Sequence, residues 1–288
     1  MPSLATNTFK TLRQSLIRVW ELSSSSIHDL KQGPMCDFWL VCHTKDRRTA
    51  ILTIESITMF SLNPIGTIFL ISNEINKPDW VPQYVTYIYE GLLPVTSVAA
   101  ALLHRVPYKG WVLQQLLKYS GASYSELFVV IDCDTVLLKP HLFFTDEGTV
   151  FRLSYEHSPH YKMFEKSLSI VGGRIFSFTC HMMPYNSNIL RELARRIEII
   201  SGQHWDEYIC TFAERFGMCV NEQDLYARFA IQFGENYDFQ PWLNKTLDHR
   251  HLSPINELAA SFPRRNSISF HNNEKRPLIL NLDKKWLG

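Results

Sequence analysis

The stretch that decides the fold is Phe128-Val129-Val130-Ile131-Asp132-Cys133-Asp134-Thr135-Val136-Leu137-Leu138. An apolar run of strand length ends here in two carboxylates that are one residue apart. Two like charges this close destabilise a folded chain unless a cation or a hydrogen-bond network offsets their repulsion. In an extended segment residues i and i+2 point to the same side, so Asp132 and Asp134 are predicted to reach one divalent ion. That ion would lie at the carboxyl end of a buried strand, where open α/β sheets bind ligands.

The composition indicates one large globular α/β domain. The chain has 288 residues, of which 45% are hydrophobic, and this content can fill a sizeable core. Its 29 basic and 28 acidic residues leave a net charge of +1, which argues against nucleic acid as the main partner. The six cysteines form no CxxC pair and are predicted to be free thiols. Because no apolar run reaches the length of a membrane span, we expect a cytoplasmic protein.

Residues 1–30 are predicted to form an N-terminal amphipathic helical arm ahead of a single catalytic domain over residues 36–288. Within the arm, apolar and basic side chains recur at helical spacing between residues 4 and 22. One interpretation is a helix that docks on its own domain or on a second copy of the chain. The other is a basic helix that lies on the inner face of the membrane as a peripheral contact.

Strands and helices alternate ahead of the acid pair, which predicts a mostly parallel sheet flanked by helices. Further along the chain helices dominate. The predicted strands cover residues 37–42, 66–72, 85–89, 128–131, 149–153, 175–179 and 267–270. The predicted helices cover residues 49–60, 111–119, 188–200, 205–216 and 222–233.

The acid pair has three interpretations. Acids at a strand end can simply cap the turn that follows. An apolar strand followed by Asp-x-Asp also resembles the nucleophile motif of haloacid-dehalogenase-type phosphatases, which implies that Asp132 attacks phosphorus and Asp134 acts as acid and base. The pair equally resembles the Asp-x-Asp motif of GT-A-type glycosyltransferases, which implies that it holds Mn²⁺ or Mg²⁺ against the diphosphate of a nucleotide-sugar donor.

The position of the motif favours the glycosyltransferase. Dehalogenase-type phosphatases tend to carry their motif on the first strand and need a second acidic pair after a later apolar strand. In this chain several predicted strands and helices, beginning at Asp37, precede the motif. No later apolar strand of the sequence ends in paired acids.

Three blocks carry the resemblance further along the chain: Gly110-Trp111-Val112-Leu113-Gln114-Gln115-Leu116-Leu117-Lys118, Asp132-Cys133-Asp134-Thr135 and Asn221-Glu222-Gln223-Asp224-Leu225-Tyr226. Together they resemble a family of bacterial glycosyltransferase-like proteins related to polysaccharide-synthesis enzymes, over residues 36–275. In that family the last block tends to read Ser-Glu-Tyr-Glu before a Tyr two residues on. Glu222, the acid at Asp224 and Tyr226 agree with this pattern, whereas Asn221 and Gln223 depart from it. The resemblance implies the GT-A-like fold and the reaction class.

The resemblance also implies a donor site after the first strand, where GT-A enzymes receive the nucleotide base and ribose. It assigns donor contacts to His43, Thr44, Asp46 and Arg47. Asp46 is expected to accept a hydrogen bond from the base or ribose, and Arg47 to face the diphosphate. The competing interpretation is a surface turn in which Thr44 or Asp46 caps the next helix.

Two polar residues lie on the helix before the acid pair. Gln115 is predicted to reach the donor. For Lys118, a position on a solvated helix face is preferred over a contact with the donor.

Histidines at two strand ends are further candidates. Glycogenin-like and galactosyltransferase-like members of the fold bring a C-terminal His, followed by a Lys-Pro segment, onto the metal. This implies His271 as a third metal ligand, since imidazole beside two carboxylates suits Mn²⁺, with Lys275 near the diphosphate. The Gly of that segment is missing here, so a structural role for His271 stays open. His181 is predicted to contact acceptor or phosphate, or to tie a loop.

An inverting transferase needs a carboxylate that takes the proton of the acceptor hydroxyl. Glu222 is the first candidate and Asp224 the second, because both open a predicted helix. The competing explanation is that acids at a helix N-terminus complement the helix dipole whether or not they act in catalysis. A retaining enzyme needs no such base, and the two acids would then position the acceptor.

The predicted function is thus metal-dependent transfer of a sugar from a nucleotide-sugar donor to a glycan or lipid-linked acceptor, in surface polysaccharide synthesis. The alternatives are a phosphatase with Asp132 as nucleophile, and a non-catalytic glycosyltransferase-like protein that binds glycans or acts as a scaffold.

Overall fold

The computed structural model describes residues 33–154, 161–170, 176–217, 220–234 and 236–271. Its centre is a five-stranded sheet in the order β3-β2-β1-β4-β7. Neighbouring strands among the first four are parallel, and β7 pairs antiparallel with β4. The strands are β1 (Cys36–Val41), β2 (Ile65–Ser72), β3 (Val85–Tyr89), β4 (Leu127–Ile131) and β7 (Met182–Asn186). The predicted α/β class with a mostly parallel sheet is confirmed.

Two smaller sheets extend this centre. One has the order β5-β10-β9, in which β10 is antiparallel to β5 and parallel to β9. The other is the parallel pair β6-β8. Their strands are β5 (Thr135–Leu137), β6 (Thr149–Leu153), β8 (Tyr237–Pro241), β9 (Asn244–Asp248) and β10 (Ser267–His271).

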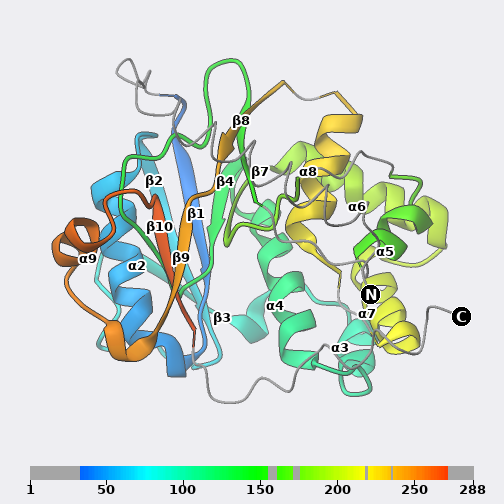
Figure 1. Ribbon diagram of the computed structural model, residues 1–288. Helices are drawn as coiled ribbons and strands as arrows, with labels where there is room; N and C mark the ends of the chain where they lie inside the picture. Colours follow the sequence, from blue (N-terminus) through cyan, green and yellow to red (C-terminus); the bar gives the residue numbers. More distant parts are fainter. Residues whose placement is uncertain (1–32, 155–160, 171–175, 218–219, 235, 272–288) are drawn as a thin grey trace, which may run out of the picture.

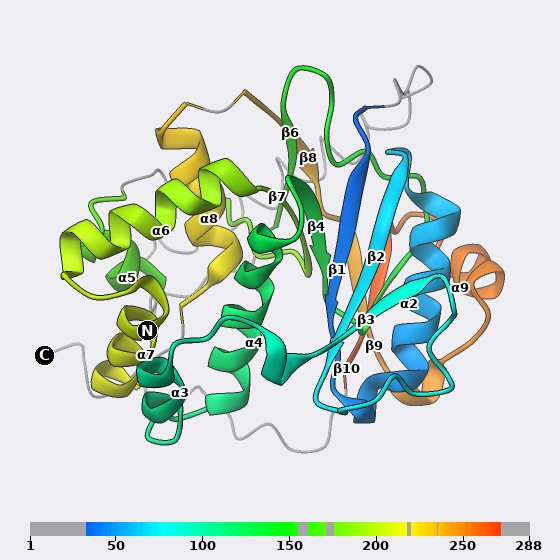
Figure 2. The ribbon, with the colours of Figure 1, turned by 180° about the vertical axis from the view of Figure 1, so that it is seen from behind.

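Helices cover both faces of the central sheet (Figures 1 and 2). On one side lie α2 (Arg47–Phe60) and α9 (Ile255–Ser261). On the other side lie α3 (Ser97–Leu103), α4 (Lys109–Tyr119), α5 (Tyr161–Ser167), α6 (Ser187–Ser201), α7 (Trp205–Phe216) and α8 (Glu222–Gln232). Short 3₁₀ helices cover Thr44–Asp46, Glu90–Leu92, Ser120–Ser123 and His249–His251. Within the described ranges, none of the helices combines the length and the apolar character needed to cross a bilayer.

The strand that carries the acid pair is buried on both faces. Phe128 and Val130 pack into the core formed with α4, α6 and α8, whereas Val129 and Ile131 pack into the core formed with α2. A strand covered by helices on both sides reads as a continuous apolar run, which is the pattern seen in the sequence. The same alternation carries Asp132 to the α4 side at the point where the strand ends.

The order of the strands reverses between β1 and β4, because β2 and β3 lie on one side of β1 and β4 lies on the other. Parallel α/β sheets form a crevice at the carboxyl ends of the strands at such a reversal. The segments that leave β1 and β4 begin at Cys42 and Asp132, so they share this edge. In Figure 1, β1 and β10 both run downward to it.

One predicted strand is wrong. Residues 176–179, the described part of the predicted strand over 175–179, form only an isolated bridge between Ser177 and Ser154. The strand that does form is β7, which contains Pro184. Proline cannot donate a backbone hydrogen bond and is tolerated in a strand only at a sheet edge, which is where β7 lies. The predicted arm over residues 4–22 lies outside the described residues.

Because His141 is buried, we expect the free energy of unfolding to depend on pH. Its Nδ1 lies 3.2 Å from a guanidinium nitrogen of Arg152 and its Nε2 lies 3.1 Å from the carbonyl oxygen of Asn266. Burial, and after it the charge of Arg152, lower the pKa of His141 from 6.5 to about 3. The unfolded chain therefore binds a proton in a pH window where the folded chain does not, and the free energy of unfolding falls as the pH drops from about 6.5 towards 3.

Urea unfolding at a series of pH values measures this effect. We expect the contribution of His141 to reach at most about 1.4 kcal/mol per pH unit, and His141→Gln to flatten the slope between about pH 4 and pH 6.5. His104→Gln changes an exposed residue at the end of α3 and serves as the control. An equal slope in wild type and His141→Gln would contradict the assignment.

Candidate metal and donor site

A buried ion triad connects the acid pair to α4 and α8. The Lys118 Nζ lies 2.7 Å from Oδ1 of Asp132 and 2.7 Å from Oε1 of Glu222. Burial by itself would lower the pKa of Lys118, but the two carboxylates outweigh it and raise that pKa. Burial would likewise raise the pKa of Asp132, but Lys118 and then His181 lower it. Lys118 and Asp132 are therefore both charged at neutral pH.

The expectation that Lys118 lies on a solvated helix face is wrong. Lys118 is 4% exposed, because α4 packs this face between β4 and α8. The hydroxyl of Tyr119 adds a second link by donating to the carbonyl oxygen of Glu222 at 2.8 Å. The sequence carries one usable signal for this burial: Lys118 lies one helical turn after Gln115, inside a helix whose stripe of Val112, Leu116 and Tyr119 faces the core.

His181 reaches the same point from the segment before β7. Its backbone has a positive φ of 52°, which lies in the left-handed region that residues other than glycine adopt uncommonly and at some cost. Two contacts with Asp132 hold it there: the backbone N–H of Asp132 donates to the His181 carbonyl oxygen at 2.9 Å, and His181 Nδ1 lies 3.0 Å from Asp132 Oδ2. The ring of Trp242 lies 5.1 Å from the imidazole. His181 was predicted at a strand end, and the structure places it just ahead of the strand.

Asp134 brings the C-terminal strand β10 to the site. Its carbonyl oxygen accepts a hydrogen bond from the backbone N–H of Phe270 at 2.8 Å, and this places His271 Nε2 3.9 Å from Asp134 Oδ2. Burial, and after it the charge of Asp132, raise the pKa of Asp134 to about 6. Unlike Asp132, Asp134 makes no ion pair with a lysine among the described residues, so its charge is the one that a bound cation would offset.

Three side chains converge in a way that suits a metal ion. Asp134, His181 and His271 each offer a ligand atom, and these atoms all lie within 4.8 Å of one another. The side chains of the three residues are between 18% and 27% exposed, so an ion can reach them from solvent. Carboxylate and imidazole are ligands for divalent cations. The predicted ligands Asp134 and His271 belong to this cluster, and Asp132 borders it.

The block Asn221-Glu222-Gln223-Asp224 anchors the segment that carries His181. Asn221 donates from Nδ2 to Thr179 Oγ1 at 2.6 Å. Gln223 Oε1 accepts from the backbone N–H of Cys180 and Asp224 Oδ1 from that of Phe178, each at 2.9 Å. Asn221 also caps α8, because its Oδ1 accepts from the Asp224 backbone N–H. Three side chains at the N-terminus of α8 therefore hold residues 178–180 in place. Glu222, which lies among them in the sequence, contacts Lys118 instead.

Asp224 does not face the cluster. Its second oxygen, Oδ2, accepts from Nε of Arg228 at 2.9 Å, and Glu165 Oε1 lies 3.8 Å from the same nitrogen. Asp224 is 2% exposed. Because both carboxylate oxygens are occupied and solvent has no access, the geometry supports an anchoring role for Asp224 rather than the predicted catalytic one.

The predicted donor loop follows β1 at the edge where the acid pair lies. In the competing interpretation Thr44 or Asp46 caps a helix. Asp46 does occupy the N-cap position of α2, but its side chain makes no capping bond, and His43 Nδ1 caps the preceding 3₁₀ helix. His43 and Arg47 are exposed, and the charge of Asp46 contributes to the raised pKa of Asp134. The loop and the acid pair are therefore electrostatic neighbours.

Two predicted donor residues are not placed at the site. Gln115 is 2% exposed, and neither polar atom of its side chain has a hydrogen-bond partner among the described residues. Its burial keeps it from the surface where a donor would bind. Lys275 lies outside the described residues.

Comparisons with known proteins name no family. No family model matches the chain, and no curated protein matches it. Among solved structures, the apo structure of WbbM, a bifunctional glycosyltransferase, is similar over 84% of this chain and 47% of its own, with 11% sequence identity and a TM-score of 0.46. This chain spans about half the length of that protein. A likeness this distant assigns no activity.

Removing the central cation of the triad should be strongly destabilising. Lys118→Met leaves the carboxylates of Asp132 and Glu222 without their shared partner, and we expect a loss of about 3–5 kcal/mol in the free energy of unfolding. Lys109→Met, an exposed position on the same helix, should change it by less than about 0.5 kcal/mol. Urea unfolding compares the two variants. Equal losses in both would contradict the triad.

Asp134 should lower the stability of the metal-free protein. Asp134→Asn keeps the shape of the side chain and removes a charge that burial and Asp132 disfavour. We expect a rise on the order of 1 kcal/mol in the free energy of unfolding at neutral pH in chelator. Asp146→Asn, at an exposed position, is the matched control, and a fall in stability for Asp134→Asn alone would contradict the repulsion.

Proposed function

We propose that this protein is a metal-dependent glycosyltransferase of the GT-A type, which moves a sugar from a nucleotide-sugar donor to a glycan or lipid-linked acceptor. The observation that carries the proposal is the meeting of Asp134, His181 and His271 at the strand-order reversal, next to the loop that follows β1. A cation site and an open loop at this edge of a parallel sheet suit a ligand that has both a diphosphate and a nucleoside.

The donor would lie across the carboxyl ends of β1 and β4. The exposed residues His43 and Arg47 suit contacts with the nucleoside and the diphosphate, as the resemblance implies. The bound cation, Mn²⁺ or Mg²⁺ in enzymes of this type, offsets the negative charge that develops on the leaving nucleoside diphosphate.

In the proposed reaction, Glu222 and Asp224 have roles other than the catalytic base that the sequence suggested. Glu222 is 5% exposed and ion-paired with Lys118, and an ion-paired carboxylate is a weak proton acceptor. Its position suits a different role, which is to hold the Lys118 ammonium beside Asp132. The prediction that Glu222 accepts the acceptor's proton stays a prediction. Asp224 supports the site indirectly, by anchoring the segment before His181.

Aromatic side chains suit the approach of a carbohydrate acceptor. Tyr237 and Phe239 on β8 are both partly exposed, and their ring centroids are 5.0 Å apart. The chain continues from β8 to Trp242, whose ring lies beside His181. Rigid aromatic faces with a few polar groups nearby are typical of small-molecule sites. This arrangement extends from the proposed metal site along β8.

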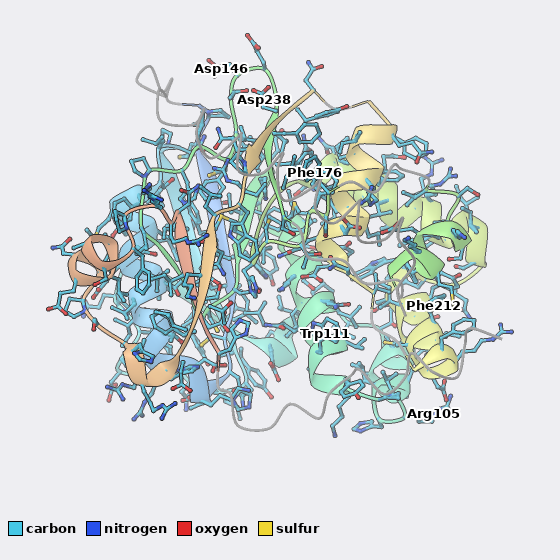
Figure 3. The ribbon with its side chains drawn as sticks, viewed as in Figure 1. Arg105, Trp111, Asp146, Phe176, Phe212 and Asp238 are labelled. Atoms are coloured by element: carbon cyan, nitrogen blue, oxygen red, sulfur yellow. The ribbon has the colours of Figure 1, made fainter. Side chains whose placement is uncertain are left out.

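Titration calorimetry with a panel of nucleoside diphosphates and Mn²⁺, followed by donor-hydrolysis assays, tests the proposal. We expect one nucleotide to bind only with metal, and Asp134→Ala to abolish hydrolysis of the matching nucleotide sugar. Asp146→Ala, which changes an exposed acid at the top of Figure 3, should leave it unchanged.

Three outcomes would overturn the proposal. Full hydrolysis in the presence of a chelator would remove the metal role. Release of phosphate from an aryl phosphate, with Asp132 trapped by fluoro-beryllate, would favour the phosphatase. A lack of nucleotide binding under every condition would favour a non-catalytic protein.

A further inference from the structure

We infer that the divalent cation is bound by Asp134, His181 and His271, and that Asp132 orients His181 instead of binding the metal. This inference deepens the proposed function, because it assigns the ligands of the same site. It departs from the reading in which both acids of the Asp-x-Asp motif are ligands. The motif would then supply one ligand and one supporting residue.

The contacts of Asp132 argue against a direct metal bond. Its Oδ1 faces the Lys118 ammonium at 2.7 Å and its Oδ2 faces His181 Nδ1 at 3.0 Å. A second cation on the same carboxylate would lie beside the buried charge of Lys118 and be repelled by it. Lys118 in turn is held by Glu222, so it cannot turn away without leaving Glu222 unpaired. Asp132 is thus already neutralised by the protein.

The orientation of His181 is that of a supported metal ligand. Because Nδ1 is directed at the Asp132 carboxylate, the neutral ring carries its proton on Nδ1, and Nε2 is then the nitrogen whose lone pair can bind a cation. Histidines that bind metals in proteins almost always donate their other N–H to a carboxylate, a carbonyl or water in this way. The pair His181–Asp132 has this carboxylate–histidine arrangement before any metal is bound.

Several elements hold His181 where a ligand is needed. The left-handed backbone at His181 is fixed on its N-terminal side by the bond from Cys180 to Gln223 and by the contact with Asp132 itself. The ring also lies near those of Trp242 and His271, with centroid distances of 5.1 and 5.4 Å. A costly conformation held by this many contacts is an arrangement expected at a functional position.

The ligand set also predicts which metal binds best. Two imidazoles and one carboxylate favour later divalent transition metals, whereas Mg²⁺ prefers oxygen ligands. We therefore expect affinity to rise from Mg²⁺ to Mn²⁺ to Co²⁺. A site made of two aspartates and one histidine would discriminate less against Mg²⁺.

Co²⁺ titration of the full chain, without any donor, tests the inference by calorimetry and by visible absorption. Asp134→Asn and His181→Gln should each weaken binding by at least about 100-fold, whereas Asp132→Asn, which keeps a hydrogen-bond acceptor, should weaken it by roughly 10-fold as an outer-shell change does. His104→Gln, at an exposed position on the α3 side, is the matched control. Circular dichroism confirms that each variant is folded.

X-ray absorption of the wild-type Co²⁺ complex provides a readout that needs no variant, because imidazole rings give a distinctive scattering pattern. Two imidazoles support the inference, and one imidazole overturns it. Loss of binding in Asp132→Asn with full binding in His181→Gln would also overturn it. Co²⁺ binding to this ligand set without any nucleotide binding would refute the proposed transfer reaction alone, so the two failures can be told apart.

Discussion

The site depends on one buried ammonium group. Lys118 takes the charge of Asp132 at the end of β4 and the charge of Glu222 at the start of α8, and both contacts are 2.7 Å long. Burying three charged groups is costly, and it is tolerated only where each has its partner at close range. The triad therefore fixes the distance between α4, β4 and α8. It also offsets the charge of Asp132, whereas Asp134 makes no ion pair with a lysine within the part of the chain that the structure describes.

The start of α8 performs two tasks at once. Glu222 turns towards Lys118, while its neighbours Asn221, Gln223 and Asp224 hold the backbone of residues 178–180. This second task supplies hydrogen-bond partners to a buried segment that belongs to no strand, and unpaired backbone groups there would be costly. The consequence is local: the segment delivers His181 to Asp132 in a conformation it would not adopt alone.

The order of the strands explains why distant parts of the chain meet. β1 and β4 are neighbours and run in the same direction, so the loop after residue 42 and the turn after residue 131 leave the sheet together. The small sheet then adds His271, because β10 pairs with β5 directly after Asp134. Thr53 of α2 fixes the turn between the two acids by donating to the carbonyl oxygen of Cys133 at 3.0 Å.

Local sequence determined the parallel core. The apolar run before Asp132, the alternation of strands with helices, and the boundaries of helices such as α7 are all properties of short windows, in which period and length identify the element. Local sequence also marked Asp134, His181 and His271 as polar residues near strand ends. It failed at β7, where Pro184 argues against a strand unless the strand is known to lie at an edge.

Only the tertiary structure decided what each of these residues faces. The sequence predicts Lys118 to be a surface residue, because its burial depends on the carboxylate of Glu222, which is 104 positions away. Glu222 and Asp224 are the first and second candidates for the catalytic base in the sequence, and the fold gives them different partners, Lys118 for Glu222 and Arg228 for Asp224. The pairing of charges is set by distances across the fold, and such distances are not a property of any window of sequence.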